Sequence, residues 1–337
     1  MRSLACLCDK ELLRFRFREL PLAMEKTAVP KALRQLYFEL HERGLTRFRP
    51  HAWLSNEWFS PLSIPGIAIP FYLASPRLAE LERTQTGFVE GGTPIELLQI
   101  LRHEAGHAFL TAYQLRHRED VQSVFGSFHE KYPHRYLPRP HSKKHVRHLN
   151  DFYAQSHPDE DFAETFAVWL TPRSGWRRKY RGWGVYRKLL FLDALAKELG
   201  HRRPRLTNQK RFDPIENLPQ TLSDHYRMRR AALGLEKPSF TPREFSPLFR
   251  TSKHTPRGLS AVTFIKSVQG EICREVAKEN RFRQYTVKRI AEEMTKCCEA
   301  ADLRLAVSQR KAKPLFAKFL SRKSKKFIRE KRDYLTL

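Results

Sequence analysis

Two histidines four residues apart, with a glutamate directly after the first, are the residues of this chain best suited to chemistry. The segment reads His103-Glu104-Ala105-Gly106-His107, which is the HExxH pattern typical of zinc hydrolases. In a helix, four residues advance the chain by about 400°, so both imidazoles leave one face and can share a metal ion. Glu104 then lies beside the metal, where it can act as the general base for a metal-activated water.

The residues around this motif predict a buried helix that carries it. Thr93-Pro94 is typical of a helix start, and no proline interrupts the chain between Pro94 and Tyr113. Apolar residues recur at helical spacing, at positions 97, 98, 101, 105, 109 and 112. Because buried ionisable groups must be paired or must bind a metal, packing alone explains the motif poorly.

A catalytic zinc ion usually has three protein ligands and one water, so the motif lacks one ligand. The metzincin continuation would need glycine and histidine at positions that hold Leu110 and Tyr113, which excludes that class. A glutamate from a second helix is the remaining common solution. The missing ligand is therefore expected on a second amphipathic helix that carries a carboxylate.

Residues 153–170 predict such a helix about 50 positions further on. Ser156 is the expected N-cap, Pro158 suits the first turn, and the acidic residues 159–161 complement the helix dipole. Thr171-Pro172 ends the helix.

Glu160 and Glu164 are the candidate metal-binding carboxylates of this second helix. They are four residues apart and share one face. We assign Glu160 as the third ligand and Glu164 as the partner of the other ring nitrogen of a ligating histidine. The reverse assignment stays open, because helical spacing does not distinguish two residues on one face.

Together, the two motifs resemble a known family. His-Glu-x-Gly-His followed by His-Pro-x-Glu-Asp-Phe-Ala-Glu-Thr-Phe-Ala is similar to the bacterial zinc-binding metallopeptidases of the gluzincin group, over about residues 55–190. This resemblance implies a zincin-like α+β domain, with a small sheet, an active-site helix and a glutamate helix. It also implies that Glu160 is the ligand and Glu164 the supporting acid. Toxin-type gluzincins carry a tyrosine seven residues before the ligand, where Tyr153 stands, and that tyrosine would hydrogen-bond the oxyanion.

Composition and charge divide the chain into two expected parts. The 337 residues are 41% hydrophobic and include 23 Phe and 5 Trp, enough for a substantial core. Residues 201–337 hold 33 Lys and Arg against 14 Asp and Glu, so +19 of the net +27 lies there. We expect a metallopeptidase domain at 1–205 and a basic, mainly helical region at 206–337. Helices are expected near 259–279, 285–300 and 303–331.

The basic region predicts two kinds of partner. It could bind nucleic acid or an anionic surface, or its cations could simply face solvent. It contains no nucleic-acid motif that favours the first reading. Five cysteines without CxxC spacing indicate reduced thiols, and no apolar run reaches the roughly 18 residues of a membrane span. Charge interrupts the N-terminus too early for a secretory signal, so we expect a cytoplasmic protein.

Two further segments would border the site. Residues 66–74 are typical of a strand, and Pro70 favours an exposed edge that an extended peptide could pair with. Residues 125–150 lie between the two motifs, and their many Arg, Lys and Pro residues favour a mobile basic loop over the cleft rather than more ligands. That loop holds five histidines, His129, His134, His141, His145 and His148.

These observations predict a zinc-dependent peptidase that acts on a peptide or protein substrate. One Zn²⁺ would be bound by His103, His107 and Glu160, and Glu104 would be the general base. Two alternatives stay open: a DNA-associated protease recruited by its basic tail, and a catalytically inactive zincin scaffold that only binds other molecules.

Overall fold

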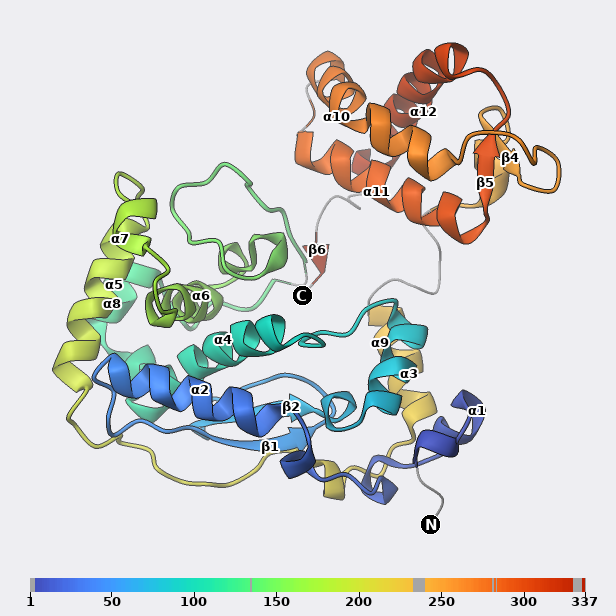
Figure 1. Cartoon of the computed structure of the whole chain (residues 1–337). Helices are drawn as coiled ribbons and strands as arrows, with labels where there is room; N and C mark the ends of the chain where they lie inside the picture. The colour runs from blue at the N-terminus through green and yellow to red at the C-terminus, as the bar shows by residue number, and fades with distance from the viewer. Residues whose placement is uncertain are drawn as a thin grey trace. The chain divides into compact units, whose positions relative to one another are not determined.

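The computed structural model describes residues 4–133, 135–232, 240–280, 282, 284–329 and 335–336. The chain divides into two compact units, which are coloured in sequence order in Figure 1. Unit 1 comprises Met1–Leu233 with Thr336–Leu337, and unit 2 comprises Gly234–Leu335. Both units consist of helices with small sheets, which confirms the coarse prediction of a mixed α and β protein.

The elements of unit 1 begin with short helical turns and continue through the site-bearing helices α4 and α6. In order they are η1 (Leu4–Cys6), α1 (Asp9–Leu12), η2 (Phe17–Glu19), η3 (Met24–Lys26), α2 (Val29–Glu42), β1 (His51–Ser55), β2 (Gly66–Pro70), η4 (Phe71–Ala74), α3 (Pro76–Thr86), α4 (Pro94–Ala112), η5 (Leu115–His117), α5 (Glu119–Phe125), β3 (Arg135–Tyr136), η6 (Asn150–Gln155), α6 (Pro158–Leu170), α7 (Trp176–Lys179), α8 (Tyr186–Leu199), η7 (Ile215–Asn217) and α9 (Leu222–Ala232).

Helix α4 runs through the middle of unit 1. Figure 1 shows α2 and the β1–β2 sheet on one side of α4 and α6 on the other, and α4 contacts α2, β2 and α6. The expected start is confirmed, because the Thr93 hydroxyl caps the helix by accepting the Glu96 N–H at 3.2 Å. From His103 to Ala112 every residue is buried, so the metal motif lies inside the core rather than on a surface helix.

The β1–β2 sheet is parallel, with His51 opposite Gly66 and Ser55 opposite Pro70. All five residues of β2 are buried. On its other side, the Ala68 N–H donates to the Phe59 carbonyl at 2.8 Å. The prediction that Pro70 marks an exposed edge is therefore wrong, because the residues around Phe59 cover the side of β2 away from β1.

The predicted boundary between residues 205 and 206 falls inside unit 1. The segment after residue 205 lies along β1, and three of its carbonyls accept hydrogen bonds from β1 side chains. These bonds join His51 Nε2 to Lys210 O at 2.8 Å, Trp53 Nε1 to Phe212 O at 2.9 Å, and Ser55 Oγ to Asp213 O at 2.6 Å. Helix α9 then packs against α3. The rise in positive charge near residue 201 thus does not coincide with a break in packing.

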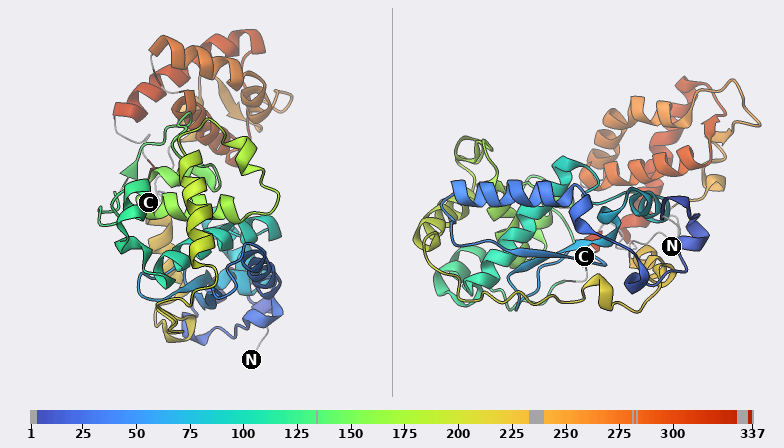
Figure 2. Two further views of the ribbon diagram at one scale, coloured as in Figure 1. Left: turned by 90° about the vertical axis from the view of Figure 1, so that its left-hand side faces the viewer. Right: turned by 60° about the horizontal axis from the view of Figure 1, so that its bottom comes forward.

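Unit 2 has its own core, formed by three helices and a two-stranded antiparallel sheet. Figure 2 shows these helices from two further directions. The elements are η8 (Pro242–Phe245), β4 (Phe249–Thr251), α10 (Ala261–Asn280), α11 (Gln284–Ala300), β5 (Leu303–Leu305) and α12 (Gln309–Arg329), and β6 (Leu335–Thr336) lies near the C-terminus. The helices predicted near 259–279 and 285–300 are confirmed. The third is partly wrong, because residues 303–305 pair with β4 as a strand before α12 begins.

All five cysteines lie in the described part of the chain, and none of them forms a disulfide. Among the described helices, none combines the length and the apolar character that a membrane span needs.

Candidate metal centre

Helices α4 and α6 approach each other closely at the glycine of the HExxH motif. A Cβ atom on Gly106 would lie 2.8 Å from the Cα atom and 3.1 Å from the carbonyl oxygen of Ala163. Only glycine fits this contact without a shift of one backbone, since Cβ atoms are not found that close to other heavy atoms. Gly106 therefore sets the separation of the two helices that carry the site residues.

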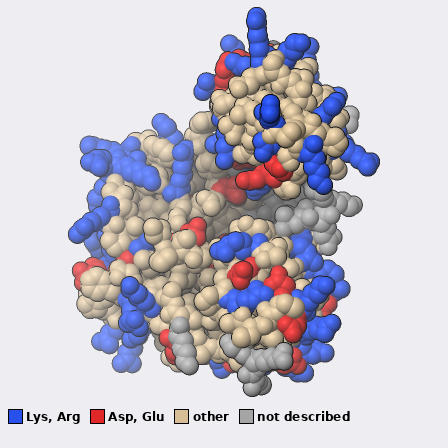
Figure 3. Space-filling view, turned by 45° about the vertical axis from the view of Figure 1, so that its right-hand side comes forward, with Lys and Arg blue, Asp and Glu red and all other residues tan. Residues whose placement is uncertain are grey.

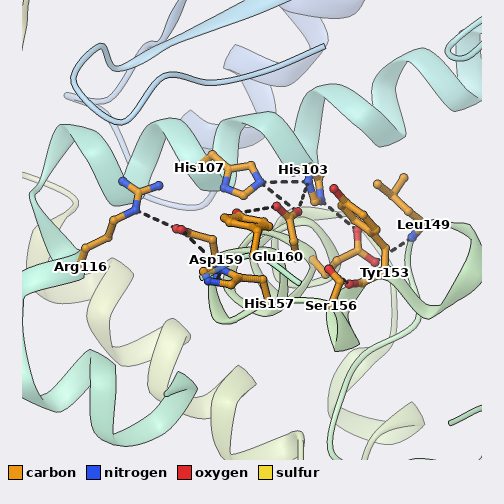
Figure 4. A network of polar contacts seen from close by, with 11 residues as sticks. His103, His107, Arg116, Leu149, Tyr153, Ser156, His157, Asp159 and Glu160 are labelled. Carbon is orange, nitrogen blue, oxygen red and sulfur yellow. Dashed lines mark hydrogen bonds and ion pairs between the residues drawn. The ribbon is translucent and has the colours of Figure 1, made fainter. Parts of the chain in front are cut away.

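Two imidazoles of α4 and one carboxylate of α6 meet at this contact (Figure 4). His103 Nε2 lies 3.1 Å from Glu160 Oε2, His107 Nε2 lies 3.2 Å from the same oxygen, and the two Nε2 atoms are 3.1 Å apart. All three side chains are buried. Ligands about 2.0–2.2 Å from a tetrahedral zinc ion are about 3.3–3.5 Å apart, so the three atoms are close to the spacing that zinc requires.

Glu164 shows why these three atoms suit a cation. Its Oε1 lies 3.0 Å from His103 Nδ1, and its Oε2 accepts the Leu149 N–H at 2.9 Å. A carboxylate only accepts, so Nδ1 carries the hydrogen and the neutral ring presents a lone pair at Nε2. That lone pair faces the carboxylate oxygen of Glu160, an arrangement that is unfavourable unless a positive charge lies between them.

The pKa shifts in the site also indicate a demand for positive charge. Burial acts to lower the pKa of His103, yet it is raised well above its usual value, because the Glu160 and Glu164 carboxylates favour the imidazolium. Burial acts to raise the pKa of Glu160, yet it is lowered well below its usual value by His107 and His103. Without a metal, a proton on His103 would take the place of the cation.

Glu104 lies beside this group without belonging to it. The side chain is buried, and its Oε2 has no hydrogen-bond partner among the described residues. Burial raises the pKa of Glu104, although the neighbouring His103 and His107 act to lower it. An unpartnered buried carboxylate oxygen next to a metal group is free to accept a proton from a bound molecule.

Tyr153 lies against the first histidine. Its ring centroid is 5.7 Å from that of His103, with 46° between the ring planes. It belongs to η6, where Asp151 and Phe152 adopt positive φ angles of 58° and 60°. This left-handed turn, unusual for residues other than glycine, brings the tyrosine back towards α4. Burial raises the pKa of Tyr153, and the acidic residues of the site add to that shift.

Sequence reasoning missed Tyr132, which lies in the loop between the two motifs. Its hydroxyl donates to Glu160 Oε1 at 2.9 Å, and its ring stacks on His157 with centroids 3.8 Å apart and planes 14° apart. In the sequence, only the five histidines of this loop have a spacing that resembles that of metal ligands. A single tyrosine in a loop without periodicity has no spacing that would mark it.

The N-cap of α6 also differs from the expectation. His157, not Ser156, caps the helix, because His157 Nδ1 accepts the Asp159 N–H at 3.1 Å. The Ser156 hydroxyl instead donates to the Tyr153 carbonyl at 2.8 Å. The expected end of the helix is confirmed, since α6 ends at Leu170 with Thr171 as its C-cap.

The acidic first turn of α6 serves more than the helix dipole. Asp159 accepts from Arg116 Nε at 2.8 Å, and Asp161 is paired with Lys188. Both carboxylates are buried. Burial raises the pKa of Asp161 to about 7, while Lys188 acts to lower it. These pairs attach α6 to η5 and α8.

The described histidines of the intermediate loop are not part of the group that could hold a metal ion, which consists of His103, His107 and Glu160. His148 Nε2 lies 2.9 Å from the Gln99 carbonyl, and His145 Nε2 lies 3.9 Å from Asp161 Oδ2. His134 lies outside the described residues.

Comparisons with known proteins agree with this geometry. Neither the curated proteins nor the solved structures include one that matches the chain. Residues 82–175, which span α4, the intermediate loop and α6, match the sequence model of a family described as "Putative zinc-binding metallo-peptidase". The resemblance of the two motifs to zinc-binding metallopeptidases is thereby confirmed for this part of the chain.

Proposed function

We propose that the protein is a zinc-dependent metallopeptidase that hydrolyses peptide bonds, built on a zincin-like arrangement of the sheet, α4 and α6. The observation that carries the proposal is the group of three ligand atoms, 3.1 to 3.2 Å apart, beside the unpartnered Glu104 carboxylate. The family match over residues 82–175 supports the same assignment.

His103 and His107 would hold zinc through their Nε2 atoms, and Glu160 would hold it through Oε2. When bound, zinc lowers the pKa of its water to about 7 and polarises the scissile carbonyl. Glu164 keeps a hydrogen on His103 Nδ1 and so keeps the Nε2 lone pair available.

Glu104 takes the proton of the attacking water and delivers it to the leaving amine. Its raised pKa makes the carboxylate a stronger base than an exposed glutamate would be. Tyr153, next to His103, would donate a hydrogen bond to the oxyanion that forms when the carbonyl is attacked.

The test is the Glu104→Gln variant, which keeps the shape of the side chain and removes its basicity. We expect hydrolysis of denatured casein or of a fluorogenic peptide mixture to fall by about 10³-fold. Zinc content, measured by elemental analysis, should stay at one ion per chain. Glu119→Gln, which changes an exposed acid on α5, is the matched control and should keep full activity.

Two results would contradict the proposal. Residual activity above about a tenth of the wild-type rate would exclude Glu104 as general base, since a single general base typically contributes 10²–10⁴-fold. A wild-type protein without zinc, whose thermal stability a chelator does not change, would instead favour an inactive scaffold that only binds other molecules.

A second candidate function, nucleic-acid binding, concerns unit 2. Residues 309–329, which form α12, include nine Lys and Arg and no Asp or Glu. Lys311, Lys318, Arg322 and Lys325 are exposed and follow one face of the helix over about 21 Å. Figure 3 shows Lys and Arg side chains projecting over much of the visible face of unit 2.

The packing of α12 favours nucleic acid over a membrane as the partner. Four of its large apolar side chains, Phe316, Phe319, Leu320 and Phe327, are buried in the core of unit 2, whereas Leu315 is 41% exposed. A single exposed leucine does not form the apolar face with which an interfacial helix enters a lipid layer. The row of exposed cations is suited instead to the regularly spaced phosphates of a nucleic acid.

Fluorescence anisotropy with a labelled 20-base-pair duplex tests this second function. Four phosphate contacts predict a slope of log K against log salt of about −3.6. The triple variant Lys318→Glu, Arg322→Glu, Lys325→Glu should lose most of that slope. Lys266→Glu, Lys278→Glu, Lys296→Glu makes the same charge change at exposed positions of α10 and α11 and is the control. Equal losses in both triple variants would contradict a specific role for α12.

A further inference from the structure

The two oxygens of the Glu160 carboxylate have different partners. Oε2 faces both imidazoles, at 3.1 Å from His103 Nε2 and 3.2 Å from His107 Nε2. Oε1 accepts the hydroxyl of Tyr132 at 2.9 Å. One oxygen therefore faces the two imidazoles (Figure 4), while the other accepts a hydrogen bond from a residue of the loop between the motifs.

Tyr132 itself is held in place by the first turn of the helix that carries Glu160. Its ring stacks on His157 at 3.8 Å between centroids. His157 Nδ1 accepts the Asp159 N–H, so the ring hydrogen is on Nε2, which donates to the Glu130 carbonyl at 2.9 Å. The backbone two residues before Tyr132 and the tyrosine ring are thus both attached to His157.

Tyr132 does not fill the core. Its side chain is 47% exposed, so the ring lies at the edge of the site with its hydroxyl directed inward. Removal of the Tyr132 hydroxyl would therefore create no cavity in the core. It would also leave no buried polar atom on the Tyr132 side chain. The hydroxyl group therefore acts mainly through its hydrogen bond to Glu160.

A carboxylate can bind a metal with one oxygen or with two. In a catalytic zinc site, three single-atom protein ligands leave the fourth position to water. If Oε1 of Glu160 were free, a small rotation of the carboxylate would bring it towards the metal as well. The second oxygen would then compete with water for the open position.

We propose that Tyr132 is a positioning residue, which keeps Glu160 bound through Oε2 alone and so keeps one position at the metal open for water. The inference rests on the proposed zinc site and extends it to the loop between the two motifs. Tyr132 acts through Glu160 and does not itself need to touch the substrate.

The test uses the full chain with Co²⁺ in place of zinc, because the visible absorption of Co²⁺ reports its coordination number. Tyr132→Phe keeps the stacking on His157 and removes only the hydroxyl. We expect the visible band to change in position and intensity, since a second carboxylate oxygen that replaces the water, or binds beside it, alters the ligand set of the ion. With the zinc enzyme, kcat should fall by about 10- to 100-fold and KM should change little.

Tyr136→Phe is the matched control, because Tyr136 lies in the same loop and its hydroxyl donates to the Asp151 carbonyl at 3.0 Å rather than to a ligand. Its Co²⁺ spectrum should equal that of the wild type. A Tyr132→Phe spectrum identical to the wild-type spectrum would overturn the inference, as would the same change in both variants.

The outcomes separate this inference from the proposed function. Suppose that Tyr132→Phe changes the Co²⁺ spectrum as expected but the wild-type protein cleaves no peptide. The positioning role of Tyr132 would then stand, and only the proposed peptidase activity would be contradicted. A wild-type chain that binds no Co²⁺ would overturn the metal site and the role of Tyr132 together.

Discussion

Two helices of this protein, α6 and α12, each carry charge of a single sign, but that charge lies in opposite environments. In α6, four acidic residues are 1% to 5% exposed, and each contacts at least one basic or imidazole side chain. Those pairs are Asp159 with Arg116, Glu160 with His103 and His107, Asp161 with Lys188, and Glu164 with His103. In α12, most cations face solvent, and the pairs Lys313–Glu271 and Lys323–Glu244 connect it to the rest of unit 2.

A run of like charge indicates function more specifically when it is buried than when it is exposed. Burial of a charge costs free energy unless a specific partner compensates it. Buried acidic residues on a helix therefore indicate that basic partners or a bound cation lie next to them. An exposed charge costs little and is screened by salt, so an exposed basic helix indicates only a class of partner. Changes to the buried charges should therefore have larger effects than changes to the exposed ones.

The largest expected effect follows from removal of a buried acid at the metal group. Glu160→Ala should weaken zinc binding by about 10³-fold, because it removes one of the three proposed protein ligands, and structural zinc sites bind their ion with about 10–16 kcal/mol in total. Competition with a chromophoric chelator measures the loss. Lys318→Ala, an exposed charge of α12, should leave zinc affinity unchanged and alter stability by less than about 0.5 kcal/mol. Similar effects of both variants would remove the distinction between the two helices.

The packing that brings the α6 carboxylates to α4 can be tested at Gly106. Gly106→Ala forces a Cβ atom against Ala163 and should lower the free energy of unfolding by about 2–3 kcal/mol. All five tryptophans lie in unit 1, so tryptophan fluorescence follows the unfolding of that unit alone.

Gly270 in α10 provides the opposite control, because a Cβ atom there would meet nothing within 4 Å. Gly270→Ala should stabilise unit 2 by about 0.5–1 kcal/mol, since alanine has the higher helix propensity. Circular dichroism would follow this change. A stabilised Gly106→Ala protein would show that the helices can separate without cost.

The buried histidine His225, which lacks a strong acidic partner, should have a smaller effect on stability, and that effect depends on pH. His225 is buried, its Nε2 has no hydrogen-bond partner among the described residues, and Glu57 Oε1 is 3.9 Å away. Burial, with a contribution from Arg229, lowers the pKa of His225 to about 4. The unfolded chain then binds more protons between pH 6.5 and pH 4, so stability is lost as the pH falls through this window.

Between pH 7 and pH 5 this histidine should cost unit 1 about 2 kcal/mol of stability. Urea unfolding of the metal-free protein measures the loss without interference from zinc release. His225→Phe should reduce the pH dependence by that amount. An unchanged pH dependence in this variant would show that the pKa of His225 does not differ between the folded and unfolded protein.

The elements that carry the site could be predicted from the sequence because strong local patterns encode them. The cap at Thr93 and the helical spacing of apolar residues predicted α4, and the acidic start and the Thr171-Pro172 end predicted α6. The positions of Glu160 and Glu164 on one face of α6 follow from the same periodicity. The structure adds that these two acids contact opposite nitrogens of His103.

The partners supplied by distant segments could not be predicted. Tyr132, Arg116 and Lys188 reach α6 from a loop, a short turn and another helix, and no spacing relates them to the motifs. The strand at 303–305 was missed because three residues with a partner about 50 positions away have no local signal of their own. Residues 206–232 belong to unit 1 because they pack against β1 and α3, and the composition of the segment does not indicate this packing.

The attachment of residues 206–232 to unit 1 determines how the protein can be shortened. Arg229 of α9 is paired with Glu57 and lies 3.1 Å from the fully buried Glu82. A recombinant fragment that ends at residue 205 would keep every proposed zinc ligand but leave Glu82 buried without its guanidinium. We expect such a fragment to aggregate during expression. A fragment that ends at residue 232 retains the pair, so it is the truncated form of the protein to use for crystallisation.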